Sequence, residues 1–460
     1  MSVDTPPRSQ IPEPSGPRGP WQRARYYASR LRPRRVAATI AWAWNILRQI
    51  WRRRRMRGGS RLTVAVDAAA LWGNLTGIGW YLYRVLEHLS HHPELHLRLY
   101  GPRLAQAPQD PRPPVPLPQG PAIEWVHVEC PEELTLPPWR LAELVERVRP
   151  LLAAADGNEV LFLPNFLLPG TLRLTRQPRL VTLHDLAFRL HPETLRTATL
   201  DDLTSHLPRT LSRARRIVTP TATVAQEVRQ VGLAPGIDVG EILHGPGQLA
   251  SQPGAERADA PADAEELPAA VPDAFVLHVG TVEPRKNLQV LFDAWRLLRE
   301  RGFSPPPLVL VGGDGWKLEQ LASQIAEGQQ QGWLIRPGYV TNPELATLYR
   351  RARAVVFPTL YEGFGLPAVE TQSAGTPLLA SDIPVLREVA GEGALYCPPR
   401  DAEAWGQALE RLLTSPQLAQ DLIVAGHRNI QRFSWQRSAE LHGQALLTLA
   451  GRDPSATEGS

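Results

Sequence analysis

The chain has 460 residues, of which 43% are hydrophobic, so it is long enough for two domains of ordinary size with real cores. Its only two cysteines, Cys130 and Cys397, are far apart and in no metal-ligand spacing, which excludes a disulfide framework and favours a reducing compartment. Residues 1–60 carry 14 arginines and 2 acidic residues, a net charge of +12, so with +4 overall the remaining chain carries −8.

Residues 1–60 are therefore expected to form a basic arm, with the Pro-, Ser-, Gly- and Arg-rich stretch 1–20 disordered. Residues 36–51 predict an amphipathic helix that is too short to span a bilayer. Four arginines follow it where a signal peptide would have a small-residue cleavage site. One face of this helix carries apolar side chains, namely Val36, Ile40, Trp44, Leu47 and Trp51.

This composition is typical of a helix that lies on a membrane surface, so we expect residues 30–57 to bind an anionic membrane. The alternative is a helix that packs on its own protein. No base-reading module accompanies the arginines, and nucleic acid is not expected as a partner.

Residues 61–247 predict a Rossmann-like α/β domain. A strand from Leu62 ends at Asp67, a loop with Gly77 and Gly79 follows, and a helix is expected from about Trp80. The two glycines would let the backbone approach a ligand closely, although a simple tight turn explains them equally well. Strands alternating with helices, as in a parallel sheet, are expected over residues 94–100, 122–128, 159–163, 179–183, 215–219 and 239–243.

His184 directly follows the strand predicted over residues 179–183. Because ligands in open α/β sheets bind beyond the carboxyl ends of the strands, His184 is placed to meet a substrate. A structural histidine, next to a helix start capped by Asp185, is the alternative.

The Ala-, Pro- and acid-rich stretch 248–272 predicts a flexible linker, and residues 273–430 predict a second Rossmann-like domain. Arg285 and Lys286 come after its first strand and before a helix that Asn287 can cap. Arginine as a two-pronged donor and lysine as a point charge suit a diphosphate, but a solvated basic pair is the alternative.

The stretch around residues 356–377 predicts a strand, a glycine-rich turn and a helix that starts near Gly365 and Leu366. The amino end of a helix binds anions such as a diphosphate. Glu362 in the turn and Glu370 in the helix can accept hydrogen bonds from vicinal hydroxyls of a sugar or ribose. Together they indicate a nucleotide-sugar site, whereas an ordinary strand–turn–helix with solvated glutamates is the alternative.

The sequence Glu362-Gly-Phe-Gly-Leu-Pro-Ala-Val-Glu370 resembles the E-x7-E motif of retaining glycosyltransferases of family 4, which have the GT-B fold. The resemblance covers about residues 62–450, with further motifs in family order. It implies two Rossmann-like domains facing a cleft, and a helix over residues 431–450 that crosses back to the first domain.

The resemblance also implies roles for the candidate residues. Glu362 would hold the sugar hydroxyls, Glu370 the ribose, and His184 would contact the transferred sugar. The loop with Gly77 and Gly79 would face the acceptor and the donor phosphates. The backbone around Tyr339 and Val340 would meet the base, although Tyr339 suits a core position equally well. Many members carry an arginine where this chain has Thr281, so Arg285 is expected to supply that charge.

The segments Glu-Pro-Arg-Lys-Asn and Tyr-Glu-Gly-Phe-Gly-Leu-Pro look most like bacterial mannosyl- or related transferases that build surface polysaccharides. We therefore expect transfer of a hexose, with mannose from GDP-mannose as the first guess, to a glycan or lipid-linked acceptor. The resemblance implies that the α configuration is retained. The sequence contains no metal-ligand motif, so a metal-independent reaction without a cofactor is expected. The basic arm predicts that it takes place at the inner face of the cytoplasmic membrane.

A catalytically inactive GT-B scaffold that binds partners is the competing interpretation. Another GT-B enzyme, such as an epimerase or a phosphorylase, is a further one. A phosphorylase needs a lysine for its pyridoxal cofactor, and Lys317, the only lysine besides Lys286, has no such context.

Overall fold

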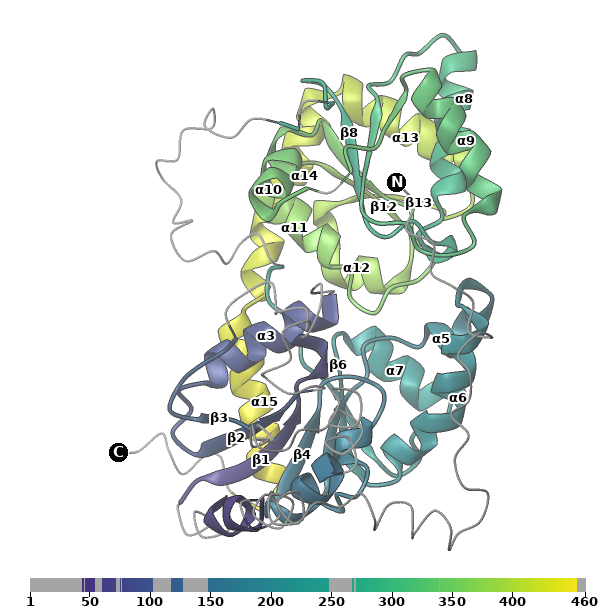
Figure 1. Cartoon of the computed structure of the whole chain (residues 1–460). Helices are drawn as coiled ribbons and strands as arrows, with labels where there is room; N and C mark the ends of the chain where they lie inside the picture. Colours follow the sequence, from purple (N-terminus) through teal and green to yellow (C-terminus); the bar gives the residue numbers. More distant parts are fainter. Residues whose placement is uncertain are drawn as a thin grey trace, which may run out of the picture.

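The computed structural model describes residues 44, 46–53, 60–71, 75, 77–101, 117–126, 148–247, 267–268, 270–338 and 340–452. Most of the predicted arm and linker, and Tyr339, lie outside this set. The described residues form two lobes, one above the other in Figure 1, and each lobe is a parallel sheet covered by helices. This confirms the predicted fold class.

The first lobe is built on a seven-stranded sheet in the order β3-β2-β1-β4-β5-β6-β7, in which all neighbouring strands are parallel. Its strands are β1 (Leu62–Asp67), β2 (Leu95–Tyr100), β3 (Ile123–Trp125), β4 (Val160–Leu163), β5 (Arg179–Thr182), β6 (Ala214–Thr219) and β7 (Asp238–Glu241). Its named helices are α3 (Gly77–Leu89), α5 (Ala187–Leu190), α6 (Thr197–Leu211) and α7 (Ala222–Gln230).

The second lobe is built on a six-stranded parallel sheet in the order β10-β9-β8-β11-β12-β13. Its strands are β8 (Val276–Val279), β9 (Leu308–Val311), β10 (Leu334–Ile335), β11 (Ala354–Phe357), β12 (Leu378–Ser381) and β13 (Leu395–Cys397). Its helices are α8 (Leu288–Glu300), α9 (Glu319–Gln330), α10 (Asn342–Arg351), α11 (Leu366–Ala374), α12 (Pro384–Ala390), α13 (Ala402–Thr414) and α14 (Pro416–Asn429).

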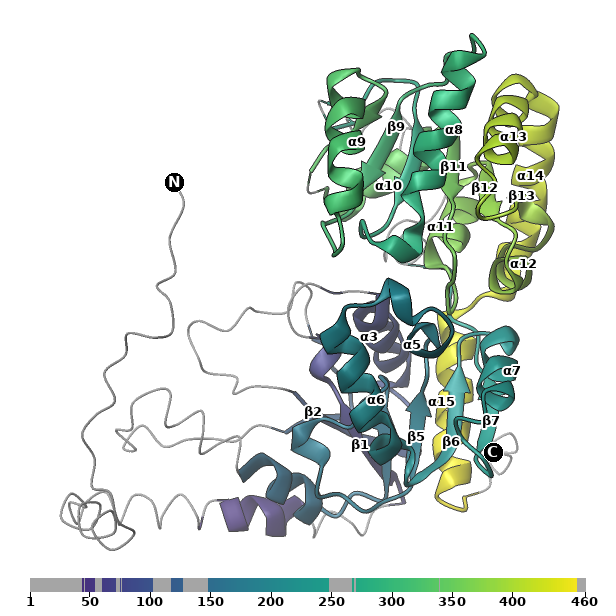
Figure 2. The same cartoon turned by 90° about the vertical axis from the view of Figure 1, so that its right-hand side faces the viewer.

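The central strands are short apolar runs buried on both faces, as parallel sheets require. β1, β4 and β5 in the first lobe and β9, β11 and β12 in the second have every residue buried. Helices cover both faces of each sheet (Figures 1 and 2). The chain then returns through α15 (Trp435–Leu449), which packs against α3 of the first lobe, so the predicted crossing helix is confirmed.

The two lobes are closed on each other. One apolar cluster contains Leu183 and Val224 of the first lobe together with Phe364 and Val389 of the second. Glu388 of α12 accepts hydrogen bonds from the first amides of α7, Ala222 N and Thr223 N, both at 2.8 Å. A carboxylate at a helix amino end stabilises it, so α7 of one lobe is capped by the other.

Two local predictions were wrong. Helix α3 begins at Gly77 and not near Trp80, so Gly77 and Gly79 lie in its first turn. Asn287 does precede α8, but its side chain does not cap it. Its φ is +55° and its amide nitrogen donates instead to the carbonyl oxygens of Pro358 (3.0 Å) and Pro399 (2.6 Å). The side-chain amide of Asn287 therefore bonds carbonyl groups from distant parts of the chain and not the amino end of α8.

Candidate active site

Glu362, Lys286 and Arg285 meet in one buried cluster. Arg285 and Lys286 lie in a short 3-10 turn after β8 (Pro284–Lys286), and Glu362 lies in the loop after β11, the neighbouring parallel strand. Lys286 Nζ donates to Glu362 Oε1 at 2.6 Å, and Arg285 Nη1 pairs with Glu362 Oε2 at 2.9 Å. The Thr359 hydroxyl adds a bond to Glu362 Oε1 at 2.8 Å. Glu362 is thus held at both oxygens.

The three charged groups of this cluster shift one another's pKa values. Burial by itself raises the pKa of Glu362, but the cations of Arg285 and Lys286 and the bonds from Lys286 and Thr359 lower it to about 2. Burial lowers the pKa of Lys286, and Glu362 opposes this. Burial also lowers the pKa of Arg285, and Glu362 and Glu283 more than reverse that. The carboxylate is therefore ionised at neutral pH although it is buried.

The guanidinium of Arg285 already has protein partners for several of its donors. Besides Glu362, its guanidinium bonds Glu283 Oε1 at 2.7 Å and the carbonyl oxygen of Tyr361 at 2.9 Å. The ammonium of Lys286 has three donors and its bond to Glu362 uses one. Lys286 is therefore the better placed of the two predicted diphosphate ligands, and Arg285 mainly orients the Glu362 loop.

Glu370 lies at another point where the two lobes meet, beside Gly247. It is buried in α11, and its Oε2 accepts a hydrogen bond from Tyr349 Oη at 2.9 Å. A Cβ at Gly247, where the first lobe ends, would come within 2.4 Å of Glu370 Cγ, so no larger residue fits there. Gly365, with φ at +92°, sets the amino end of α11, which starts at Leu366.

His184 lies where β5 ends, against the Glu362 loop. A Cβ at Gly363 would come within 1.7 Å of His184 O, so the two lobes are in close main-chain contact here. His184 Nε2 donates to the carbonyl oxygen of Pro164 at 2.8 Å. Burial lowers the pKa of His184, so the ring is neutral at pH 7 and its Nδ1 is an acceptor. That nitrogen suits a sugar hydroxyl.

The remaining predicted residues are spread around the cleft. Gly77, in the first turn of α3, faces Leu366 of the other lobe, whose Cδ1 would lie 3.6 Å from an added Cβ. Gly79 packs within its own lobe, since a Cβ there would lie 2.6 Å from Ala70 O. Val340 packs against the core of the second lobe, before α10. Tyr339 lies outside the described residues.

The sequence reasoning missed His244. Its ring is stacked between Tyr81 of the first lobe (centroids 4.7 Å apart) and Phe364 of the second (4.9 Å). It is buried, and neither of its ring nitrogens has a partner among the described residues. Burial, then His184 and His442, hold the pKa of His244 well below its usual value. The sequence did offer a signal for this residue, because His244 follows the strand β7 as His184 follows the strand β5.

His278 in β8 was also missed. Its Nδ1 donates to Val356 O at 3.0 Å, and its Nε2 has no partner in the described structure. A Cβ at Gly280 would lie 3.5 Å from both this nitrogen and Lys286 Cε. The His278 side chain therefore points from the sheet toward Lys286. The apolar pattern of a buried strand does not reveal this direction.

Across the part of the chain that the structure describes, no group of three His, Cys, Asp or Glu side chains is placed to hold a metal ion. Nor does any described helix combine the length and the apolar run that crossing a membrane requires.

Comparison with known proteins places this geometry in a family. The family model for glycosyl transferases group 1 matches residues 259–428. The chain is 35% identical over 162 residues to O-antigen chain mannosyltransferase B of Escherichia coli, a match that spans 35% of this chain and 42% of that protein. The match thus covers less than half the length of this relative.

Two solved structures share the fold. Sucrose-phosphate synthase from Thermosynechococcus elongatus is 22% identical, with a TM-score of 0.63 over 85% of this chain and 100% of its own. Anabaena Alr3699/HepE in complex with UDP is 16% identical, with a TM-score of 0.55 over 84% of this chain and 100% of its own. The predicted family and the GT-B fold are confirmed: residues 259–428 of this chain belong to the glycosyl transferases group 1, and both lobes together form a GT-B fold.

Proposed function

We propose that the protein transfers a hexose, and mannose first of all, from a nucleoside diphosphate sugar to a glycan or lipid-linked acceptor. The observation that supports this proposal is that Glu362 is buried and ionised and is held by Lys286 beyond the carboxyl ends of β8 and β11. Mannose is favoured because the chain is 35% identical over 162 residues to O-antigen chain mannosyltransferase B.

In this proposal Glu362 accepts hydrogen bonds from the sugar hydroxyls and Glu370 from the ribose. Lys286 binds the diphosphate and, with the amino end of α11 at Gly365 and Leu366, stabilises the negative charge that develops on the leaving group. Preorganised cations in a water-poor cleft are effective because little reorganisation is needed. No metal ion is required in this scheme, and transfer should therefore persist in EDTA.

The sugar is transferred with retention of the α configuration. His184 contacts the sugar close to the reacting carbon through its unprotonated Nδ1. The bond from the anomeric carbon to the diphosphate oxygen breaks, the bond to the acceptor oxygen forms on the same face, and a diphosphate oxygen takes the acceptor's proton. An NMR spectrum of the product that shows the β anomer would contradict this scheme.

A thermal-shift titration with GDP, UDP, ADP and their hexose conjugates tests the donor site first. Binding to the folded protein alone raises its melting temperature, so GDP and GDP-mannose should give the largest shifts. A larger shift with UDP, the nucleotide bound to Alr3699/HepE, would assign a UDP-sugar instead. Absence of any shift would favour the inactive scaffold.

We also propose that the protein works in the cytoplasm, attached to the inner face of the membrane where lipid-linked acceptors lie. The basic arm, with a net charge of +12 over residues 1–60, supports this location. Recovery of the protein in the membrane pellet at low salt, and its release at high salt, is the expected result of cell fractionation.

A further inference from the structure

The short helix over residues 46–53 has two opposite faces. At about 100° per residue, Ile46, Gln49, Ile50 and Arg53 share one side, and these four side chains are half-buried or buried against the first lobe. Trp44, Leu47 and Trp51 lie on the other side with exposures of 61%, 55% and 57%, beside the exposed Arg48 and Arg52. The described part of the predicted apolar stripe, Trp44, Leu47 and Trp51, therefore points away from the protein.

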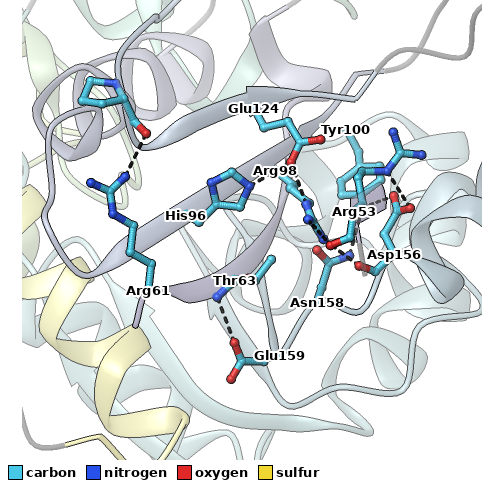
Figure 3. A network of polar contacts seen from close by, with 11 residues as sticks. Arg53, Arg61, Thr63, His96, Arg98, Tyr100, Glu124, Asp156, Asn158 and Glu159 are labelled. Carbon is cyan, nitrogen blue, oxygen red and sulfur yellow. Dashed lines mark hydrogen bonds and ion pairs between the residues drawn. The ribbon is translucent and has the colours of Figure 1, made fainter. Parts of the chain in front are cut away.

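The helix is fixed in this orientation by the buried network of Figure 3. Arg53 Nε pairs with Asp156 Oδ1 at 2.8 Å, and Asp156 Oδ2 accepts from Tyr100 Oη at 2.8 Å. Arg98 donates to the main-chain oxygens of Asp156 (2.6 Å) and Arg53 (3.1 Å). Arg53 and Asp156 are both buried, so the helix cannot roll to hide its tryptophans without breaking an ion pair in the interior.

The outward side is the most apolar exposed feature that the structure describes. The four most exposed large hydrophobic side chains are Trp44, Leu47, Trp51 and Leu151, the last at 58%. Leu151 lies on the neighbouring helix, residues 148–155, which leads directly to Asp156. Clusters of this kind on a protein surface mark an interaction site.

We propose that this docking face, made of Trp44, Leu47, Arg48, Trp51 and Arg52, seats the protein on an anionic lipid bilayer. Tryptophan and leucine enter the interfacial region while arginine stays with the lipid phosphates. The positive charge of the surrounding sequence favours an anionic lipid surface as the partner and disfavours a second copy of the chain. No Asp or Glu occurs between Glu13 and Asp67, so two copies would present like charges to each other.

The docking face and the cleft lie at opposite ends of the first sheet. Asp156, which anchors the helix, precedes the amino end of β4, whereas His184 and His244 follow the carboxyl ends of β5 and β7. Figure 2 shows the same separation, with the arm helix at the lower edge of the lower lobe and α3 and α5 at its upper edge. A six-residue strand such as β1 spans about 20 Å, so the docking face and the residues at the carboxyl ends of the strands are separated by about that distance along the sheet.

Vesicle sedimentation of the full chain tests the docking face without donor or turnover, so its result is independent of the proposed function. Vesicles of phosphatidylcholine with phosphatidylglycerol should bind the protein, and vesicles of phosphatidylcholine alone should bind it less. The triple variant Trp44→Ser/Leu47→Ser/Trp51→Ser should bind anionic vesicles at least about tenfold more weakly because its apolar contact area is lost. Arg48→Gln/Arg52→Gln should weaken binding by roughly fivefold or more for each arginine.

The matched control is Leu190→Ser/Val231→Ser/Val424→Ser, which removes three exposed apolar side chains elsewhere and should leave sedimentation unchanged. Circular dichroism and the melting temperature check that each variant is folded. Triple-variant binding equal to wild type, or no binding by wild type, would overturn the proposal. Loss of a dimer by the Trp44/Leu47/Trp51 variant, without vesicle binding, would assign the face to a second copy instead.

The orientation is tested with an environment-sensitive dye in a chain that carries Cys130→Ser. Dye attached through Leu47→Cys should shift to the blue when anionic vesicles are added. Dye attached through Arg400→Cys, an exposed position where the two lobes meet, should not shift. A shift at position 400 equal to that at position 47 would overturn the separation of cleft and membrane.

Discussion

Glu362 is ionised although it is buried, because Lys286 lies 2.6 Å from one of its oxygens and Arg285 lies 2.9 Å from the other. Loss of either cation would leave Glu362 with one charge partner in place of two. Donor binding by Lys286 must therefore occur without loss of its bond to Glu362, which the three donors of an ammonium allow.

Lys286→Met should lower kcat by about 10²–10³ because a preorganised cation is removed from the leaving group. It should also abolish the thermal shift given by nucleoside diphosphates. Steady-state kinetics and thermal-shift titration measure both effects. Lys317→Met, at the only other lysine, removes an exposed ammonium and should leave both unchanged. Equal turnover by the two variants would remove Lys286 from the site.

Gly363→Ala should hold the lobes apart. The added Cβ would approach His184 O to within 1.7 Å, and this oxygen belongs to main chain, which cannot move without a large cost in free energy. We expect a loss of stability of about 1–3 kcal/mol and a lower kcat/KM. Urea denaturation and kinetics give these values. Gly313→Ala, where an added Cβ meets nothing within 4 Å, is the control and should change neither.

At the scale of the elements, the structure shows two different faces on the helix over residues 46–53. The sequence offered membrane binding and packing on the protein as alternatives, and the helix packs through Arg53 while it exposes Trp44, Leu47 and Trp51. A helix with two different faces satisfies the packing interpretation and leaves the membrane interpretation open to test.

Arg53→Ala should destabilise the first lobe by about 3 kcal/mol, because it leaves Asp156 buried with one charge partner fewer. Equilibrium unfolding in urea measures the change. Arg52→Ala, at the neighbouring exposed position, should alter stability by less than about 0.5 kcal/mol. Similar losses from both variants would mean that the helix is not anchored through Arg53.

At the scale of the whole molecule, four histidines are buried, namely His184, His244, His278 and His442, and burial lowers the pKa of each. The pKa values of His278 and His442 fall to about 4, whereas a histidine in the unfolded chain titrates near 6.5. The unfolded state therefore binds more protons between these values, and stability is lost as the pH falls from about 6.5 to 4.

His442→Gln should flatten this acid dependence by up to about 3 kcal/mol between pH 7 and pH 4.5. Asp67 acts in the opposite sense, since burial raises its pKa to about 6, so the difference between variant and wild type is the quantity to measure. Urea unfolding at several pH values gives it. The exposed His91→Gln is the control, and an equal change in both variants would contradict the assignment to burial.

The sequence by itself determined the fold class, the order of the elements and the identity of Glu362, Lys286, Glu370 and His184 as candidates. It did so because buried parallel strands are short apolar runs, and because ligand residues follow the carboxyl ends of such strands at readable positions. The bounds of α10 and α11 were readable for the same local reason, since caps and glycine stops act within a few residues.

Only the tertiary structure decided which partner each side chain takes. Arg285 is held by Glu362 and Glu283, Asn287 bonds two distant carbonyls in place of its helix, and His244 is stacked between two lobes. The side of the arm helix that turns outward was likewise fixed by Asp156, more than a hundred residues away. Such choices depend on contacts between segments far apart in the chain, which local patterns do not encode.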